Sequence, residues 1–343
     1  MKLVVPAALL ALVALDPAVA GPAPKPPAKA EPMLPAAPAV KPSGPATPDE
    51  VMAEAFGAFQ RGYFVTAFDL AQPLADAGLR AAQTLVGELY AKGLGVRRDP
   101  AAAAQWYRRA AAQGDAAAQF ALALMALGGD ERAADKKAAA GFFEQAAAKG
   151  HAEAAFRLAL LLLDGEARTR NAPRAAALLR RAAESGHAEA AYVLGQLYRA
   201  GDGVPASQTE AARWIGAAAQ NGLTPAQVEY GILVFNGKGV TKDEAAAAHW
   251  FRRAALAGNA IGQNRLARML AAGRGVPIDL AAAAKWHYLA RGAGISDPAL
   301  DRLLSTLGKA DRDKAKAAAK AFAAPLAGEA EPIGVAAAGP PTP

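Results

Sequence analysis

The chain has 343 residues, of which 53% are hydrophobic and none is cysteine, and its formal net charge at pH 7 is +7. The lack of cysteine excludes disulfide bonds and a thiol nucleophile, so an apolar core alone must hold any folded part together. Alanine, leucine, arginine, lysine and glutamate dominate and β-branched residues are scarce, which predicts an all-α fold. The basic excess suits an acidic partner or anionic envelope polymers, although solubility alone also explains it.

The N-terminal segment 1–20 has the layout of a secretory signal peptide. Lys2 precedes an apolar stretch, and Ala18-Val19-Ala20 forms a small-x-small cleavage sequence before Gly21. The apolar stretch is too short to cross a bilayer as a helix. We therefore predict cleavage after Ala20 and a periplasmic location for the mature chain. An N-terminal membrane anchor is the alternative.

Two segments lack the pattern of a folded element. Residues 21–48 carry a proline at every second to fifth position and hardly any large apolar side chain. Such a segment cannot bury enough apolar surface to offset the entropy that ordering would cost. We predict a Pro/Ala-rich disordered linker over 21–48 and a disordered tail over 325–343.

Glycine recurs at a spacing of 36 residues through most of the chain. The positions are Gly78, Gly114, Gly150, Gly186, Gly222, Gly258 and Gly294. Each follows an Ala-rich amphipathic stretch such as WYRRAAAQG, where a glycine can end the helix in the left-handed conformation. This ladder predicts six helix pairs of 36 residues each over 79–294.

Aligning the six units shows two repeated pairs of core positions. In the first helix a large residue precedes a small one: Val86, Leu122, Leu158, Leu194, Tyr230 and Leu266, followed by Gly87, Ala123, Ala159, Gly195, Gly231 and Ala267. In the second helix a bulky residue precedes alanine by four positions: Trp106, Phe142, Leu178, Trp214, Trp250 and Trp286, with Ala110, Ala146, Ala182, Ala218, Ala254 and Ala290. Residues four apart share a helix face, so the second pair predicts a buried stripe.

A Gly-x-Gly-Val turn separates the two helices of most units. It occurs at 93–96, 201–204, 237–240 and 273–276, whereas the second and third units keep only Gly129 and Gly165. We expect the first glycine to end the helix and the valine to pack under the turn. The turns of the second and third units should be looser or differently shaped.

These residues together resemble the Sel1-like repeat, a relative of the tetratricopeptide repeat. The stretch from Leu85 to Gly114 follows its signature almost throughout: Leu-Gly-x-x-Tyr-x-x-Gly-x-Gly-Val, then Ala-x-x-Trp-Tyr-x-x-Ala-Ala-x-x-Gly. The resemblance implies a right-handed α-solenoid of six repeats. Because a solenoid leaves an apolar face open at each end, we predict an N-terminal capping helix pair over 49–78 and C-terminal capping helices over 295–324.

No motif points to catalysis or to a cofactor. The turns lack the Lys-Ser/Thr and the preceding strand of a phosphate-binding loop, and no Gly-x-Ser-x-Gly elbow occurs. His151 and His187 begin consecutive units and are interpreted as surface helix starts, since one repeat separates them. His249 and His287 lie beside tryptophans and are expected to pack there. We predict no catalytic residue, no cofactor and no metal site.

The resemblance places the first helix of each unit on a concave face, where tetratricopeptide-like proteins bind partners. The predicted groove consists of Phe120, Leu124, Leu127, Phe156, Leu160, Leu163, Tyr192, Arg199, Val228, Ile232 and Phe235. Glu88, Lys92, Asn264 and Arg268 would form a polar rim. Either the solenoid buries this apolar face itself, or the groove is open to an amphipathic helix or an extended peptide.

The sequence thus predicts a non-catalytic scaffold or adaptor, not an enzyme, that binds another protein or peptide in the bacterial periplasm. Exported relatives imply a sensor domain or an envelope protein as the partner. Neither nucleic acid nor a membrane span in the mature chain is expected. The alternative is a peptidoglycan- or glycan-associated envelope protein with a hydrolytic or assembly role.

Overall fold

The computed structural model describes residues 47–128, 135–165 and 169–323. The predicted signal peptide, the linker up to residue 46, Gly129 and the predicted tail lie outside these ranges. Within them all regular structure is helical, in sixteen helices. None of these helices combines the length and the apolar content that a bilayer-spanning helix needs.

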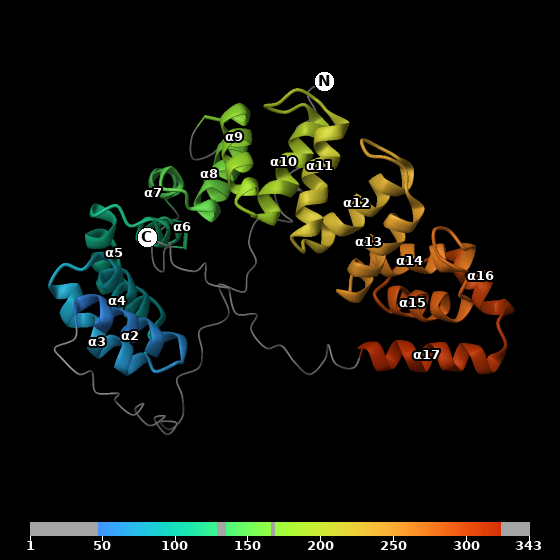
Figure 1. Cartoon of the computed structure of the whole chain (residues 1–343), viewed down its shortest axis with the longest axis horizontal. Coiled ribbons are helices and arrows are strands. Elements are labelled where there is room, and N and C mark those ends of the chain that lie inside the picture. The colour runs from blue at the N-terminus through green and yellow to red at the C-terminus, as the bar shows by residue number, and fades with distance from the viewer. Residues whose placement is uncertain (1–46, 129–134, 166–168, 324–343) are drawn as a thin grey trace. The chain divides into compact units, whose positions relative to one another are not determined.

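The helices form pairs in chain order (Figure 1). The first helices of the six units are α4 (Arg80–Lys92), α6 (Ala116–Gly128), α8 (Ala152–Asp164), α10 (Ala188–Ala200), α12 (Thr224–Asn236) and α14 (Ala260–Ala272). The second helices are α5 (Pro100–Ala112), α7 (Lys136–Ala148), α9 (Ala172–Glu184), α11 (Gln208–Gln220), α13 (Glu244–Leu256) and α15 (Leu280–Gly292). A pair precedes them, α2 (Pro48–Gln60) and α3 (Phe64–Asp76), and α16 (Pro298–Thr306) and α17 (Lys309–Ala323) follow.

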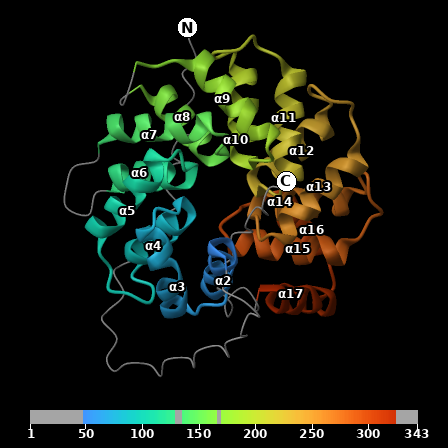
Figure 2. The same ribbon diagram turned by 60° about the vertical axis from the view of Figure 1, so that its left-hand side comes forward.

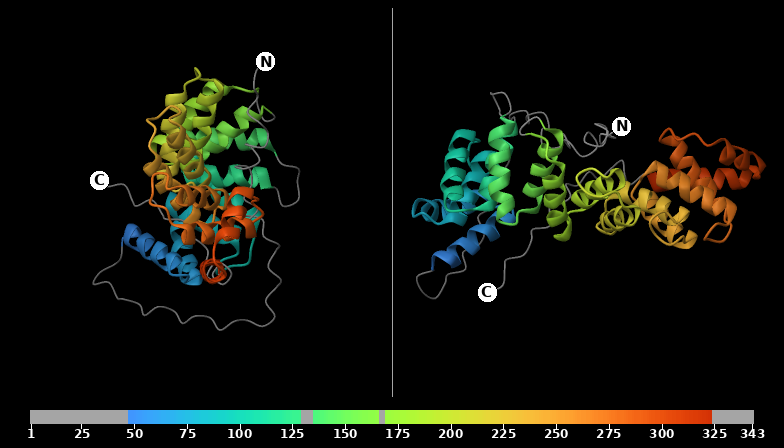
Figure 3. Two further views of the ribbon diagram at one scale, coloured as in Figure 1. Left: turned by 90° about the vertical axis from the view of Figure 1, so that its right-hand side faces the viewer. Right: turned by 90° about the horizontal axis from the view of Figure 1, so that it is seen from above.

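Contacts divide the chain into two compact parts, 1–207 and 208–343. We call these parts unit 1 and unit 2, and we call the six 36-residue helix pairs repeats. In unit 1 each helix packs on the next from α2 to α10. The first helices α4, α6, α8 and α10 lie along the inner side of its curve, and α5, α7 and α9 lie along the outer side (Figure 2). Unit 2 continues the same packing from α11 to α15, and α16 and α17, in red, lie at its end (Figure 3).

The ladder glycines end the second helices as predicted. All seven have φ between +81° and +95°, in the left-handed region. After α3, for example, the Leu79 N–H donates to the Leu74 carbonyl at 2.9 Å and the Gly78 N–H donates to the Ala75 carbonyl at 3.0 Å. This is the Schellman arrangement, which satisfies the last carbonyls of a helix.

The second glycine of each Gly-x-Gly-Val turn joins one repeat to the repeat before it. A Cβ atom on Gly275 would lie 2.3 Å from both the carbonyl carbon and the carbonyl oxygen of Glu244, at the start of α13. Gly95, Gly203 and Gly239 press in the same way on the first residues of α3, α9 and α11. The sequence pattern predicted a helix end at the first glycine but did not predict this contact.

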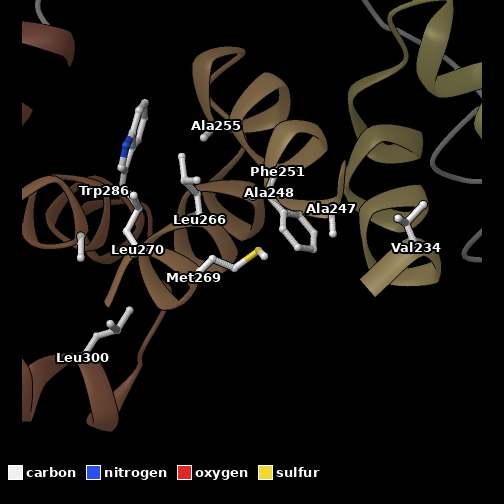
Figure 4. Close-up of a cluster of buried hydrophobic side chains, with 12 residues drawn as sticks. Val234, Ala247, Ala248, Phe251, Ala255, Leu266, Met269, Leu270, Trp286 and Leu300 are labelled. Atoms are coloured by element: carbon white, nitrogen blue, oxygen red, sulfur yellow. The ribbon is translucent and has the colours of Figure 1, made fainter. Parts of the chain in front are cut away.

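The core lies one residue away from where the tryptophan column suggested. In all six repeats the residue that follows the position of the tryptophan column is at most 2% exposed: Tyr107, Phe143, Leu179, Ile215, Phe251 and His287. These side chains cover the small residues of the first helices, as Phe251 covers Gly231, where a Cβ would lie 2.8 Å from its ring. Phe251 and Leu266 lie between Val234 and Trp286 in the core of unit 2 (Figure 4). Trp214 and Trp286 are buried too, whereas Trp106 and Trp250 are half-buried.

Four buried glutamines join neighbouring repeats. Each side-chain amide donates to a carbonyl near the end of the preceding second helix, at 3.2 to 3.4 Å: Gln83 to Ala75, Gln119 to Ala111, Gln227 to Ala219 and Gln263 to Ala255. The third and fourth repeats have Ala155 and Ala191 at this position. Four of the six repeats therefore share a glutamine whose role depends on the preceding helix and is not evident from its own repeat.

A buried carboxylate attaches the C-terminal cap. Asp297, 1% exposed, is the N-cap residue of α16 and accepts hydrogen bonds from Asn264 Nδ2 at 2.7 Å and from Arg268 Nε at 2.6 Å. Burial raises the pKa of this carboxyl, but the bonds from Arg268 and Asn264 outweigh burial and lower it to about 2. Asn264 and Arg268, predicted as rim residues, therefore hold the cap in place.

Replacing Gly275 should destabilise the fold far more than replacing Gly258. Both residues have positive φ, but a Cβ on Gly258 meets nothing within 4 Å, so only the backbone conformation is strained. We expect Gly258→Ala to lower the free energy of unfolding by about 1 kcal/mol and Gly275→Ala by about 3 kcal/mol or more. Urea unfolding followed by circular dichroism measures both. Equal losses would show that the turn does not press on α13.

Asp297 should make stability depend on pH in acid. Its pKa is about 2 in the folded chain and near 3.8 in the unfolded chain, so its contribution is complete above pH 4 and is lost as the pH falls through 2. Between pH 5 and pH 2 the wild type should lose about 2 kcal/mol more than Asp297→Asn, which keeps the helix cap without the charge. Parallel unfolding curves over this range would contradict the assignment.

Candidate functional site

The predicted groove residues fall into three classes of exposure. Phe156, Leu163 and Val228 are buried. Leu124, 40% exposed, and Arg199 face solvent. The remaining six are half-buried: Phe120, Leu127, Leu160, Tyr192, Ile232 and Phe235. The face is therefore neither fully closed nor fully open.

Residues at the start of the next repeat cover one column of this face. The ring of His151 stacks on Phe120 with centroids 4.5 Å apart, and the ring of His187 lies 4.7 Å from that of Phe156. Both histidines are N-cap residues, and their Nδ1 atoms accept the N–H groups of Ala154 and Ala190 at 3.2 Å. This confirms that they start helices. Asn264 and Asp297 are in contact at the corresponding place in unit 2, so this column joins repeats rather than facing a partner.

Unit 2 covers most of its own share of the predicted groove. Val228 is buried, and Ile232 packs against the core cluster of α13 and α14. Phe235 lies under the guanidinium of Arg274, whose carbon is 4.2 Å from the ring centroid, and Arg274 pairs with Glu244. Little apolar surface of the predicted groove remains free here.

Unit 1 retains an apolar strip on two of its first helices, α6 and α8. We name the first-helix strip the set Leu124 and Leu127 of α6 with Leu160 of α8. Leu124 and Leu160 hold the same position in consecutive repeats, one column away from the covered aromatic residues. At this position in α4 stands Glu88, which pairs with Lys92 at 2.6 Å and accepts the Tyr107 hydroxyl at 3.0 Å. The strip is therefore apolar on α6 and α8 and charged on α4.

A charged cluster lies at the N-terminal ends of α8 and α10. Glu153 bonds to His187 Nε2 at 2.6 Å and accepts a hydrogen bond from Arg157. Burial raises the pKa of Glu153, but these two partners outweigh burial and lower it to about 2. Burial lowers the pKa of His187, and bonds to Glu153 and Glu189 reverse this and raise it to about 9. A protonated ring could not accept the Ala190 N–H, so this helix cap competes with Glu189, 3.3 Å from Nδ1, for that nitrogen.

The other two histidines have separate structural surroundings. His287 is buried, and its Nε2 lies 3.0 Å from Asp301, which also pairs with Arg291. This pair keeps the polar edge that the sequence predicted. His249 meets the ring of Trp250 edge-on, with centroids 5.8 Å apart, but it is exposed, so it packs there only at the surface. In the described part of the chain no three potential ligands come together to hold a metal ion.

Two family models match the chain. The Sel1 repeat model matches residues 80–115, 116–151, 224–259 and 260–294. The model of plant tetratrico peptide repeats matches residues 134–211. The second repeat, which lacks the Gly-x-Gly-Val turn, thus matches the Sel1 model. The third repeat and most of the fourth match the tetratricopeptide model. A sequence comparison with curated proteins gives no match.

Solved structures of Sel1-repeat proteins are similar to this chain. A Sel1 repeat protein from Oxalobacter formigenes is 27% identical with a TM-score of 0.59, and the match covers 72% of this chain and 99% of that one. A protective antigen of uropathogenic Escherichia coli with the same type of fold is 26% identical, with a TM-score of 0.47 and coverage of 81% and 69%. The repeat matches and the first of these structures lead to one assignment: the chain belongs to the Sel1-like repeat proteins and is an all-α repeat solenoid.

Proposed function

We propose that the chain is a non-catalytic scaffold that binds another protein or peptide through the first-helix strip. Sel1-like and tetratricopeptide-like repeats generally mediate protein–protein interaction. The supporting observation is Leu124, a leucine that is 40% exposed on α6, while neighbouring columns of the same face are covered by the next repeat. Exposed apolar side chains that lie together commonly mark interaction sites.

The strip suits an amphipathic helix or an extended peptide. Leu124 lies on α6 and Leu160 lies on α8. A ligand that contacts both leucines must therefore cross the two helices and present apolar side chains to them. Burying a leucine side chain fully contributes about 1.5–3 kcal/mol, and these two are already partly covered. A few such anchors give moderate affinity, which suits an adaptor or a regulator.

We further propose that the mature chain works in the bacterial periplasm. The charge, apolar stretch and cleavage sequence of residues 1–20 support export. The partner would then be the sensor domain of a membrane kinase or another envelope protein.

An envelope glycan is the alternative partner. The net charge of +7 would attract anionic polymers such as peptidoglycan. Sedimentation with purified peptidoglycan separates the two ideas, because a protein-binding scaffold should stay in solution. Retention that persists in Leu124→Asp and falls as salt rises would favour the glycan.

Leu124→Asp and Leu160→Asp should each abolish partner capture without unfolding the chain. A carboxylate on the strip would have to lose its water against an apolar ligand, so we expect affinity to fall by about tenfold or more. The partner is identified by crosslinking and mass spectrometry in the native envelope and is then titrated in purified form. Leu256→Asp, at a 55% exposed leucine on α13 outside the strip, is the matched control. If circular dichroism shows unfolding of the strip variants, these leucines are core residues and the proposal fails.

Export predicts a defined N-terminus. In the producing bacterium the mature chain should be recovered from the periplasmic fraction with Gly21 as its first residue, since cleavage is expected after Ala20. N-terminal sequencing and intact mass measure this directly. A chain that retains Met1 and fractionates with the cytoplasm would contradict it.

A further inference from the structure

A cavity of about 530 Å³ opens in unit 1, away from the first-helix strip. It is lined by Phe68 of α3, Tyr90 of α4 and the turn residues Val96, Arg97, Arg98, Asp99 and Pro100 that lead into α5. Its volume is within the range of sites that bind small ligands or single peptide side chains.

One residue distinguishes this place from the later repeats. Phe68 stands where the second helix of every following repeat has alanine: Ala104, Ala140, Ala176, Ala212, Ala248 and Ala284. The Phe68 ring meets Tyr90 edge-on, with centroids 5.5 Å apart and an interplanar angle of 89°. The cavity therefore has an aromatic wall made of two half-buried rings, which an alanine could not provide.

The turn of the first repeat adds positive charge to this wall. It carries Arg97 and Arg98, where the other Gly-x-Gly-Val turns continue with Pro205-Ala206, Thr241-Lys242 and Pro277-Ile278. Arg98 Nε donates to the Ala91 carbonyl at 3.2 Å. Arg97 is exposed and has no ion pair with any residue of the described segments.

The single carboxylate of the wall is already engaged. Asp99 is the N-cap residue of α5, and its Oδ1 accepts the Ala102 N–H at 2.9 Å. The cavity thus offers aromatic and aliphatic surface beside the exposed guanidinium of Arg97, with one acid that is occupied by its own helix. An anionic group next to an apolar ring complements this arrangement in both charge and chemistry.

We propose that this cavity binds an acidic peptide segment in which an aromatic side chain stands next to Asp or Glu. The aromatic side chain lies against Phe68, Tyr90 and Val96, and the neighbouring carboxylate accepts hydrogen bonds from Arg97. The site is a second contact for a protein partner. It shares no residue with the first-helix strip, so each of the two binding proposals can be disproved without affecting the other.

The test uses the full mature chain and a labelled peptide, Gly-Ser-Glu-Phe-Glu-Ser-Gly, followed by fluorescence anisotropy. We expect saturable binding that Arg97→Glu weakens by about tenfold or more. Phe68→Ala should weaken binding to a similar extent with the helical signal intact, because alanine is the residue of the other repeats at this position. Peptides with Ala in place of Phe, or Lys in place of both Glu residues, should not bind.

Two controls separate the cavity from general attraction. Arg108→Glu makes the same charge change at an exposed position on α5 outside the cavity and should leave the affinity within about twofold. Leu124→Asp should also leave it unchanged, which keeps this result apart from the fate of the strip. The proposal is overturned if the peptide does not bind, if Phe68→Ala has no effect, or if Arg108→Glu weakens binding as much as Arg97→Glu. Equal binding of polyglutamate would likewise identify an anionic polymer as the occupant.

Discussion

The contact between the turn of one repeat and the second helix of the repeat before it fixes the register on which the rest of the structure depends. At Gly275 this contact joins backbone to backbone, and no side chain fits between the turn and Glu244. Glycine is the one residue that satisfies both the left-handed conformation and the close approach. The contact recurs in the four repeats that carry the Gly-x-Gly-Val turn, so their first helices meet the preceding second helix at the same height. The large and small columns then pack into the buried clusters of each unit.

The same register decides which surface is left for a partner. Where the first-helix column is aromatic, the N-cap residue of the next repeat covers it, as His151 covers Phe120. The adjacent column varies from Glu88 through Leu124 and Leu160 to Arg268. Arg268 bonds to Asp297, whereas Leu124 stays exposed. Stacking therefore requires some positions to stay nearly constant and leaves others open to selection for binding. In a repeat protein this division separates stability from specificity more cleanly than in a globular domain.

The repeat length and the helix ends could be predicted from the sequence, since regularly spaced glycine and amphipathic periodicity are local signals. The alignment of the core was missed by one residue. Trp106 is bulkier than Tyr107 and is therefore the more obvious core candidate. Amphipathicity defines the buried helix face only approximately, and both residues lie near that face. The burial of Phe156 and Val228 could not be predicted from their own helices. His187 of the next repeat covers Phe156, and the burial of Val228 depends on tertiary packing. The cavity depends on Phe68, the one residue of its column that is not alanine. The sequence does not show that this ring meets Tyr90, so the cavity could not be predicted from it.

If the first-helix strip contacts a protein, site-specific photocrosslinking in the native cell should capture that protein. A benzoylphenylalanine residue is placed at position 124 or, as the control, at position 256 on α13. We expect a discrete protein adduct from position 124 that is absent from position 256. No protein adduct at position 124, or the same adducts from both positions, would contradict it.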